Sequence, residues 1–152
     1  MQEEYLAFVL SRECREALIR QFPPAFPDVR AHHVTLLQPD DPLMAQTSRR
    51  LCNYYCNLNQ ARFDLTAVGY VAGDNVDAVS VQLGGLLSAL VESRVAADPF
   101  TYFHVTMSVR AGHRASEAKE LGSRTAGNRP AGWCGYTMQL SGSLQILTRN
   151  KE

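Results

Sequence analysis

The sequence lacks any long hydrophobic run, and this excludes the simplest membrane architectures. No apolar stretch approaches the roughly 18–20 residues that a membrane-spanning helix requires. The N-terminal segment "MQEEYLAFVLSRE" is acidic and its apolar part is short, which is not the pattern of a secretory signal. We therefore expect a cytoplasmic protein that does not act at a membrane and forms a single domain over residues 1–152.

Cysteine is also scarce, and net charge is absent. Four cysteines are too few for a small secreted disulfide scaffold. Cys52 and Cys56 have the spacing of a metal pair on a helix, but no histidine lies near them in the sequence, and reduced thiols are the simpler interpretation. Fifteen basic residues balance 15 acidic ones, which argues against binding long nucleic acid through counterion release. A small nucleotide in a local pocket remains possible.

Hydrophobic periodicity predicts an α+β protein. Short apolar or alternating runs predict strands over 5–11, 32–37, 62–73, 76–83, 103–110 and 136–149. Amphipathic patterns predict helices over 11–22, 40–60, 84–96 and 114–124, with loops over 23–30 and 125–135. The order repeats roughly by halves, so we expect two similar lobes related by a pseudo-two-fold, with antiparallel sheets lining a central cleft and helices outside.

Each half contains one strand with the pattern His-Val-Thr between apolar residues. Side chains alternate faces along a strand, so His33 and Thr35 share one face while Val34 points to the other. His104 and Thr106 have the same relation in the second strand. If the two strands lie side by side at the centre of the cleft, two imidazoles and two hydroxyls meet in one concave site.

Two imidazoles and two hydroxyls suit phosphodiester cleavage without a metal. The reaction needs a base that activates the attacking oxygen and an acid that protonates the departing one, and histidine serves as either near neutral pH. Fixed hydroxyl donors stabilise the charge on the non-bridging oxygens. The alternative interpretation is that both residues are ordinary strand histidines with local hydrogen bonds.

The segments "HVTL" (33–36) and "HVTM" (104–107) resemble the signature of the 2H phosphoesterase superfamily, whose two His-x-Thr/Ser motifs lie on two lobes of a bilobal α+β fold. The resemblance implies that His33 and His104 are catalytic, with the acid and base unassigned, and that Thr35 and Thr106 bind the phosphate. It also implies no metal or cofactor. The implied substrates are small nucleotides or short oligonucleotides with 2′,3′-cyclic phosphates or 2′-5′ linkages.

The length of the chain is closest to that of compact viral members of this superfamily, which degrade cyclic nucleotide alarm signals or 2′-5′ oligoadenylate. The resemblance therefore implies evasion of antiviral immunity, in the host cytoplasm for a viral protein. In the phage type a first-strand tyrosine helps to bind the nucleotide, and Tyr5 matches its place. That type also uses a late acidic residue, whereas this chain has none between Glu120 and Glu152.

Several other side chains are candidate substrate contacts. Trp133 lies in a glycine-flanked segment, where it can stack on a base or fill the edge of the core, and Tyr102 is open to the same two interpretations. Arg110 shares the side-chain parity of the second motif and can reach a phosphate or end in solvent. We expect His32 to point away from its neighbour His33, and His113 to be a surface residue.

Three rival functions remain open. The nearest is a 2′,3′-cyclic phosphodiesterase in RNA-end processing. A second is a non-catalytic module that only sequesters a nucleotide. The third is a metallohydrolase using His32, His33 and His104, which lacks a carboxylate near either motif. The sequence leaves the oligomeric state open, and we assume a monomer.

Overall fold

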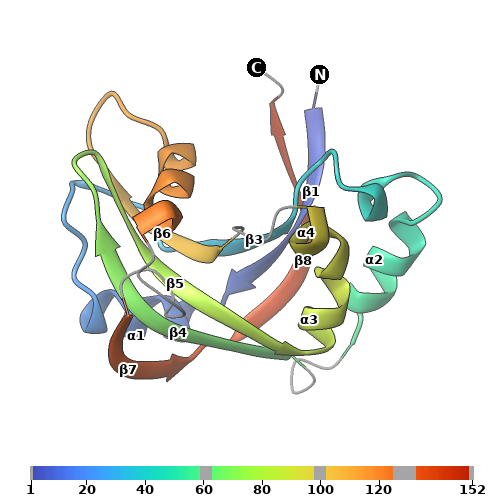
Figure 1. The fold of residues 1–152 in the computed structure, drawn as a ribbon, viewed down its shortest axis with the longest axis horizontal. Coiled ribbons are helices and arrows are strands. Elements are labelled where there is room, and N and C mark those ends of the chain that lie inside the picture. The colour runs from blue at the N-terminus through green and yellow to red at the C-terminus, as the bar shows by residue number, and fades with distance from the viewer. Residues whose placement is uncertain (1, 59–62, 98–101, 125–132, 151–152) are drawn as a thin grey trace.

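One strongly curved antiparallel sheet forms the frame of the protein (Figure 1). The computed structural model describes residues 2–58, 63–97, 102–124 and 133–150. The strands are β1 (Gln2–Leu10), β2 (Asp28–Val29), β3 (His33–Leu37), β4 (Phe63–Ala72), β5 (Val76–Gly85), β6 (Phe103–Val109), β7 (Trp133–Gln139) and β8 (Gly142–Asn150). The helices are α1 (Arg12–Gln21), α2 (Arg49–Cys56), α3 (Leu86–Leu90), α4 (Glu92–Ala97) and the 3₁₀ segments η1 (Pro42–Met44) and η3 (Ala115–Arg124).

The strand order is β7-β4-β5-β6-β3-β1-β8, with β2 paired to β6 beside this path. β3 and β6, which contain the two His-Val-Thr motifs, are therefore neighbours in the middle of the sheet, as predicted. The α+β class with antiparallel strands is confirmed, but the strands form one continuous sheet rather than separate sheets. Only Leu140 and Ser141 separate β7 at one edge of the sheet from β8 at the other.

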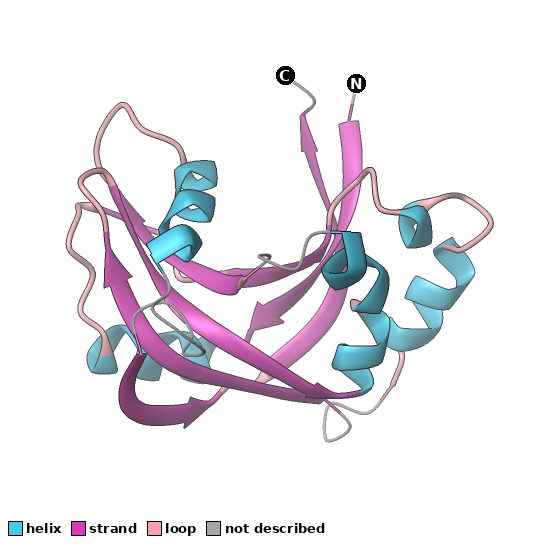
Figure 2. Cartoon of the chain, in the orientation of Figure 1, coloured by secondary structure: helices cyan, strands magenta, loops and turns pink. Residues whose placement is uncertain are grey.

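The helices lie at the sides of this frame. Figure 2 shows α2, α3 and α4 together on one side and η3 on the opposite side, with the central strands between them. None of the helices in the described part of the chain is long and apolar enough to cross a membrane.

Two predicted helices are shorter than their sequence patterns. In place of the helix predicted over 40–60, the described residues up to 58 form η1 and then α2, because the backbone is extended at Ala45 after the 3₁₀ turn. The turn itself begins as predicted, with Pro42 at its start and the Asp41 carboxylate accepting a hydrogen bond from the Leu43 amide at 3.0 Å. Residues 84–96 form α3 and α4 as separate short helices, with Gly85 in the left-handed region (φ 59°) before α3.

The strands present their apolar faces to a continuous core. Val34, Leu36, Val105 and Met107 from the two motif strands are fully buried, together with Leu6 and Phe8 from β1. The predicted alternation is therefore confirmed for the side chains that face the core, Val34 and Val105. A smaller cluster packs between the β5–β6 pair and η3, and includes Val109, Ala118 and Leu121.

A buried carboxylate fixes the segment that leads into β3. Asp77 on β5 is fully buried and accepts hydrogen bonds from the Tyr70 hydroxyl, the Ser108 hydroxyl and, at 2.9 Å, the backbone amide of Ala25. The Phe26 amide donates to the Ser108 hydroxyl at 3.0 Å. These bonds hold the end of the predicted loop 23–30 against β6, where Asp28 and Val29 form the short strand β2.

Candidate active site

The register of β3 and β6 brings the four motif side chains together. Val34 lies opposite Val105 in this antiparallel pair. His33 and Thr35 flank this pair on β3, and His104 and Thr106 flank it on β6, so the four side chains lie near one another across the two strands. The two histidines are thus diagonal neighbours, which lie roughly 7–8 Å apart in such a ladder. The four polar side chains form a block with local two-fold symmetry about the valine pair.

This block lies in a cavity of about 540 Å³, within the size range of ligand pockets. His33, Thr35, His104 and Thr106 all line it. Among the described residues, the charged groups in the lining are all basic: Arg30, Arg94, Lys119 and Arg149. A lining of cations, imidazoles and hydroxyls favours an anionic ligand with several hydrogen-bond acceptors.

His33 is held between two aromatic neighbours in this cavity. Its ring centroid lies 5.8 Å from that of Tyr5, and its Nδ1 lies 2.9 Å from the Nδ1 of His32. Burial, together with a smaller effect of the neighbouring His32, lowers the pKa of His33 to about 4. The imidazole of His33 is therefore neutral near pH 7 and has one ring nitrogen left for the cavity.

The prediction that His32 points away from His33 is wrong. The two rings meet edge to face with centroids 5.1 Å apart, and His32 also lines the cavity. The alternation of faces holds only inside a strand, and β3 begins at His33. Ala31, two residues before the start of β3, has a positive φ of 47°, so the chain bends at this residue. The backbone bend cannot be read from the residue types.

His104 has a different environment from His33. Its ring stacks on that of Tyr102 with centroids 4.5 Å apart and an interplanar angle of 18°. Its Nδ1 is buried and has no hydrogen-bond partner within the described residues. Burial is the main cause that lowers the pKa of His104 to about 4; the backbone of Tyr102 partly offsets it, and the cations Arg94 and Lys119 add to it.

Tyr102 is not in the cavity lining, so the prediction that it contacts substrate is not supported. Its ring lies behind His104 and packs on the smaller core cluster. Its hydroxyl donates a hydrogen bond to the backbone carbonyl of Ala118 in η3, and burial raises the pKa of that hydroxyl. Tyr102 is thus a support for His104.

Tyr5 does lie in the cavity, as its predicted role requires. The Arg149 guanidinium lies over its ring, 5.5 Å from the centroid, and donates to the Gln38 side-chain oxygen at 3.3 Å. Burial raises the pKa of the Tyr5 hydroxyl. An aromatic ring, a guanidinium and an amide therefore lie together beside His33, a combination suited to a nucleobase.

Arg94 is a lining residue that the sequence patterns did not single out. From α4 it donates to the backbone carbonyls of Thr35 at 2.9 Å and Leu36 at 2.8 Å, and its guanidinium lies 4.9 Å from the centroid of the Phe103 ring. It therefore ties α4 to both motif strands. In the sequence it belongs to a short helix about 60 residues from β3, and no local signal connects the two.

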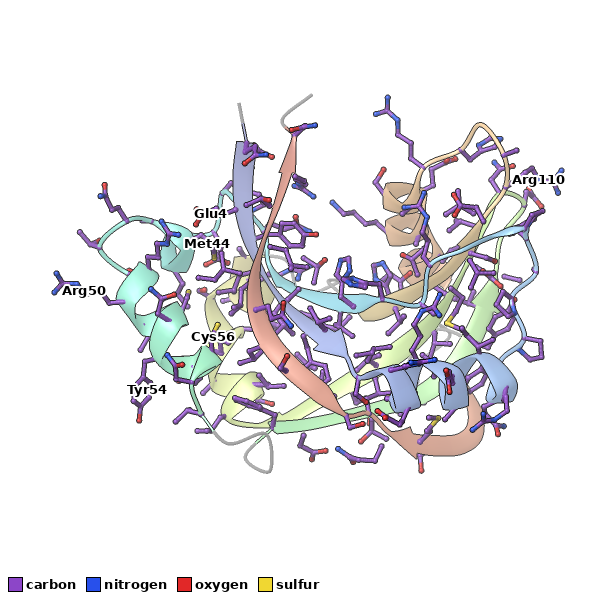
Figure 3. All side chains as sticks on the ribbon, turned by 180° about the vertical axis from the view of Figure 1, so that it is seen from behind. Glu4, Met44, Arg50, Tyr54, Cys56 and Arg110 are labelled. Carbon is purple, nitrogen blue, oxygen red and sulfur yellow. The ribbon has the colours of Figure 1, made fainter. Side chains whose placement is uncertain are left out.

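Arg110 is not among the residues that line the cavity, so the structure does not bring it to the motif side chains. Figure 3 labels it at the periphery, and its guanidinium lies 5.2 Å from the centroid of the Phe26 ring. The physical reason is a bulge: Thr106 pairs with Ala78 and Ser108 with Asp77, so the register shifts around Met107. Beyond this bulge, Arg110 no longer has to point to the same face of the sheet as His104 and Thr106.

The remaining candidates lie outside the site or outside the described atoms. His113 is exposed and pairs with Glu117 at 3.3 Å, which confirms it as a surface residue. The backbone of Trp133 begins β7 opposite Gly69, and its side chain is outside the described part of the structure.

No group of three or more potential metal-ligating side chains occurs among the described residues. Cys52 and Cys56 are free thiols on α2, and burial raises the pKa of both. The Cys52 thiol donates to the backbone carbonyl of Leu43 at 3.3 Å. Figure 3 shows Tyr54 pointing outward from the same helix, whereas Cys56 lies on its inner side.

Compared with known proteins, the chain matches no family model, no curated protein and no solved structure. Interpretation of the site therefore depends on its residues and their geometry.

Proposed function

We propose that this protein is a metal-independent phosphodiesterase of the 2H type that cleaves a small nucleotide or short oligonucleotide. The observation that supports this most strongly is the diagonal pair His33 and His104, flanked by Thr35 and Thr106 in one basic cavity. Two imidazoles on opposite sides of a phosphate can serve the attacking and the leaving oxygen of one displacement. Binding alone does not require two such groups, which argues against a simple nucleotide sponge.

The preferred linkage is 2′-5′, in an oligoadenylate or a cyclic oligonucleotide messenger of antiviral immunity. In such a linkage the neighbouring 3′ hydroxyl can attack the phosphorus once one histidine removes its proton. The bond from phosphorus to the 5′ oxygen then breaks, and the other histidine protonates that oxygen. The product is a 2′,3′-cyclic phosphate and a free 5′ hydroxyl, so atoms and charge balance.

The distribution of cations supports a substrate with more than one phosphate. Arg94 and Lys119 act electrostatically on His104, whereas Arg149 lies over Tyr5 beside His33. The basic groups therefore flank both ends of the histidine pair. An RNA that ends in a 2′,3′-cyclic phosphate also has several phosphates, and RNA-end processing is the second choice because the chain length is closer to the compact viral members of the 2H superfamily.

The test is cleavage of a substrate panel with EDTA present, followed by chromatography. The panel contains 2′-5′ oligoadenylate, cyclic di- and trinucleotides with 2′-5′ or 3′-5′ linkages, and an RNA ending in a 2′,3′-cyclic phosphate. We expect His33→Ala and His104→Ala each to lower the rate by about 10²–10⁴-fold. His113→Ala is the matched control, because that histidine is exposed and outside the cavity.

Each outcome names one of the candidate functions. Cleavage that needs both histidines and survives EDTA supports the proposal, and the substrate consumed identifies the linkage. Cleavage that EDTA abolishes would point to the metallohydrolase. Tight binding without turnover in the wild type and both variants would mean that the cavity sequesters its ligand.

A further inference from the structure

A third histidine lies in direct contact with the first motif. His32 has an exposed side chain, and its Nδ1 lies 2.9 Å from the Nδ1 of His33. A neutral imidazole has one N–H and one lone pair, so two Nδ1 atoms at this distance share one proton. The tautomer of one ring therefore sets that of the other. No feature of the His-x-Thr motif requires this contact.

We propose that His32 is the proton source for His33, and that this relay makes His33 the general acid and His104 the general base. The inference rests on the proposed phosphodiesterase function, and it adds the direction of the reaction across the cavity. His32 acts through His33 and is a positioning and proton-supplying residue rather than a catalytic one.

The relay has a balanced sequence of proton movements. A doubly protonated His32 donates its Nδ1–H to the Nδ1 of His33, so His33 has its own proton on Nε2, toward the cavity. When the bond from phosphorus to the leaving oxygen breaks, the Nε2 proton passes to that oxygen. The Nδ1 of His33 takes the proton of His32 in the same step. Both rings end neutral, and the exposed His32 regains a proton from solvent.

An acid in this position needs such a neighbour. Burial keeps the His33 ring neutral near pH 7, and a neutral imidazole is a very weak acid on its own. A proton taken up by the exposed His32 avoids placing a charge on the buried ring of His33. The negative charge of a bound phosphodiester then favours the extra proton on the pair.

Among the described residues, no titratable side chain has an equivalent contact with the Nδ1 of His104. Its Nδ1 is enclosed, and the backbone of Tyr102 favours a proton on the ring, while Tyr102 covers one ring face. A proton on Nδ1 leaves the lone pair of Nε2 for the cavity, which is the form of a general base. The two histidines thus differ in the residue that contacts each ring: His32 for His33 and Tyr102 for His104.

The other titratable and charged groups facing the His32–His33 pair come from six elements or segments around the cavity. They are Tyr5 (β1), Arg30 (before β3), Arg94 (α4), His104 (β6), Lys119 (η3) and Arg149 (β8). Four of these six are permanent cations, so an extra proton on the pair depends on an anionic ligand.

The first experiment compares two leaving groups. One substrate is the 2′-5′ dinucleotide of adenosine, and the other is adenosine 2′-(4-nitrophenyl phosphate), whose 4-nitrophenolate leaves without a proton. We expect His32→Ala and His33→Ala to lower kcat by about 100-fold on the dinucleotide and by less than about threefold on the nitrophenyl ester. His104→Ala should lower kcat on both, and His113→Ala on neither.

His32→Asn separates proton supply from positioning. The asparagine amide can donate to the His33 Nδ1 but cannot supply a proton. We expect it to retain the wild-type KM and the low kcat of His32→Ala on the dinucleotide. Recovery of kcat in His32→Asn would overturn the relay and leave His32 as a purely orienting group, and equal losses on both substrates would overturn the acid assignment.

Nitrogen-15 spectra of the four histidines test the pair without any turnover. Single-histidine variants assign the signals, and inorganic phosphate serves as the anionic probe. We expect His33 to have its proton on Nε2 when phosphate is bound, and to lose that preference in His32→Ala. A proton fixed on the His33 Nδ1 in both proteins would overturn the proposal. If the wild type cleaves no phosphodiester, the proposed function fails, whereas these spectra still decide whether His32 sets the His33 tautomer.

Discussion

His33 on β3 and His104 on β6 stand at equivalent places in two nearly identical motifs, and the structure supports them in different ways. His33 contacts an exposed titratable neighbour, His32, and the ring of Tyr5 inside the cavity. His104 is backed by the buried ring of Tyr102 and has an enclosed Nδ1. The motif determines which groups face the cavity, whereas the residues behind it determine what each imidazole can do.

The strand environments differ in the same sense. β3 is only five residues long, and its pairing with β6 is centred on a single valine pair. His33 is the first residue of β3 and follows the bend at Ala31 by two residues. β6 is seven residues long and pairs along most of its length with β5. One histidine therefore lies at the first residue of its strand, next to the exposed His32, and the other lies within the β5–β6 ladder.

The largest expected effect concerns stability rather than catalysis. Because burial lowers both histidine pKa values from 6.5 to about 4, the unfolded chain binds protons in this range that the folded chain does not. The free energy of unfolding should therefore fall as the pH drops from about 6.5 to about 4. The loss is on the order of 3 kcal/mol for each histidine.

Urea denaturation at several pH values measures this loss in the wild type, His33→Gln and His104→Gln. Each variant should lose its own share of the pH dependence, which separates the histidines from the carboxylates that titrate lower. Curves that run parallel in all three proteins would show that the two rings are not held neutral by burial.

The sequence predicts the paired motifs well because they depend on short-range rules. Alternation along a strand places His33 with Thr35 and His104 with Thr106, and the buried Val34 confirms it. Those rules fail where the backbone departs from regular geometry: the bend at Ala31 turns His32 toward His33.

Contacts between residues far apart in the chain are the second feature of the site that local sequence patterns do not predict. Arg94 reaches β3 from a helix about 60 residues away, and Arg149 reaches Tyr5 from the other end of the chain. The register shift around Met107 removes Arg110 from the face that simple parity assigns to it. Each case depends on how separate elements pack, which no spacing rule encodes.

A smaller effect should distinguish the two tyrosines beside the histidines. Tyr102→Leu removes the ring behind His104 and the hydrogen bond to the Ala118 carbonyl, so we expect about 2–3 kcal/mol lower stability and a lower kcat. Tyr5→Leu changes a cavity wall and should chiefly raise KM. Denaturation and steady-state kinetics measure both.

Tyr102→Phe is the matched control, because it keeps the ring and loses only the hydroxyl bond, at a cost of about 1 kcal/mol. A Tyr102→Leu variant that changes KM alone would place its ring in the substrate site after all. Tyr102 would then act as a substrate contact, and the proposed difference between the surroundings of His33 and His104 would not hold.

The smallest expected effect tests the local two-fold symmetry itself. Thr35→Val and Thr106→Val keep the branched shape and remove only the hydroxyl. Since the two threonines flank the same valine pair, one from each motif strand, the two losses should be similar. A hydrogen bond to a charged phosphate is worth about 1.5–3 kcal/mol, or roughly 10–100-fold in kcat/KM. Thr66→Val on β4, outside the cavity, should have no effect. A loss confined to one of the two motif threonines would mean that the phosphate binds to one strand, and that the symmetry of the motifs does not extend to their use.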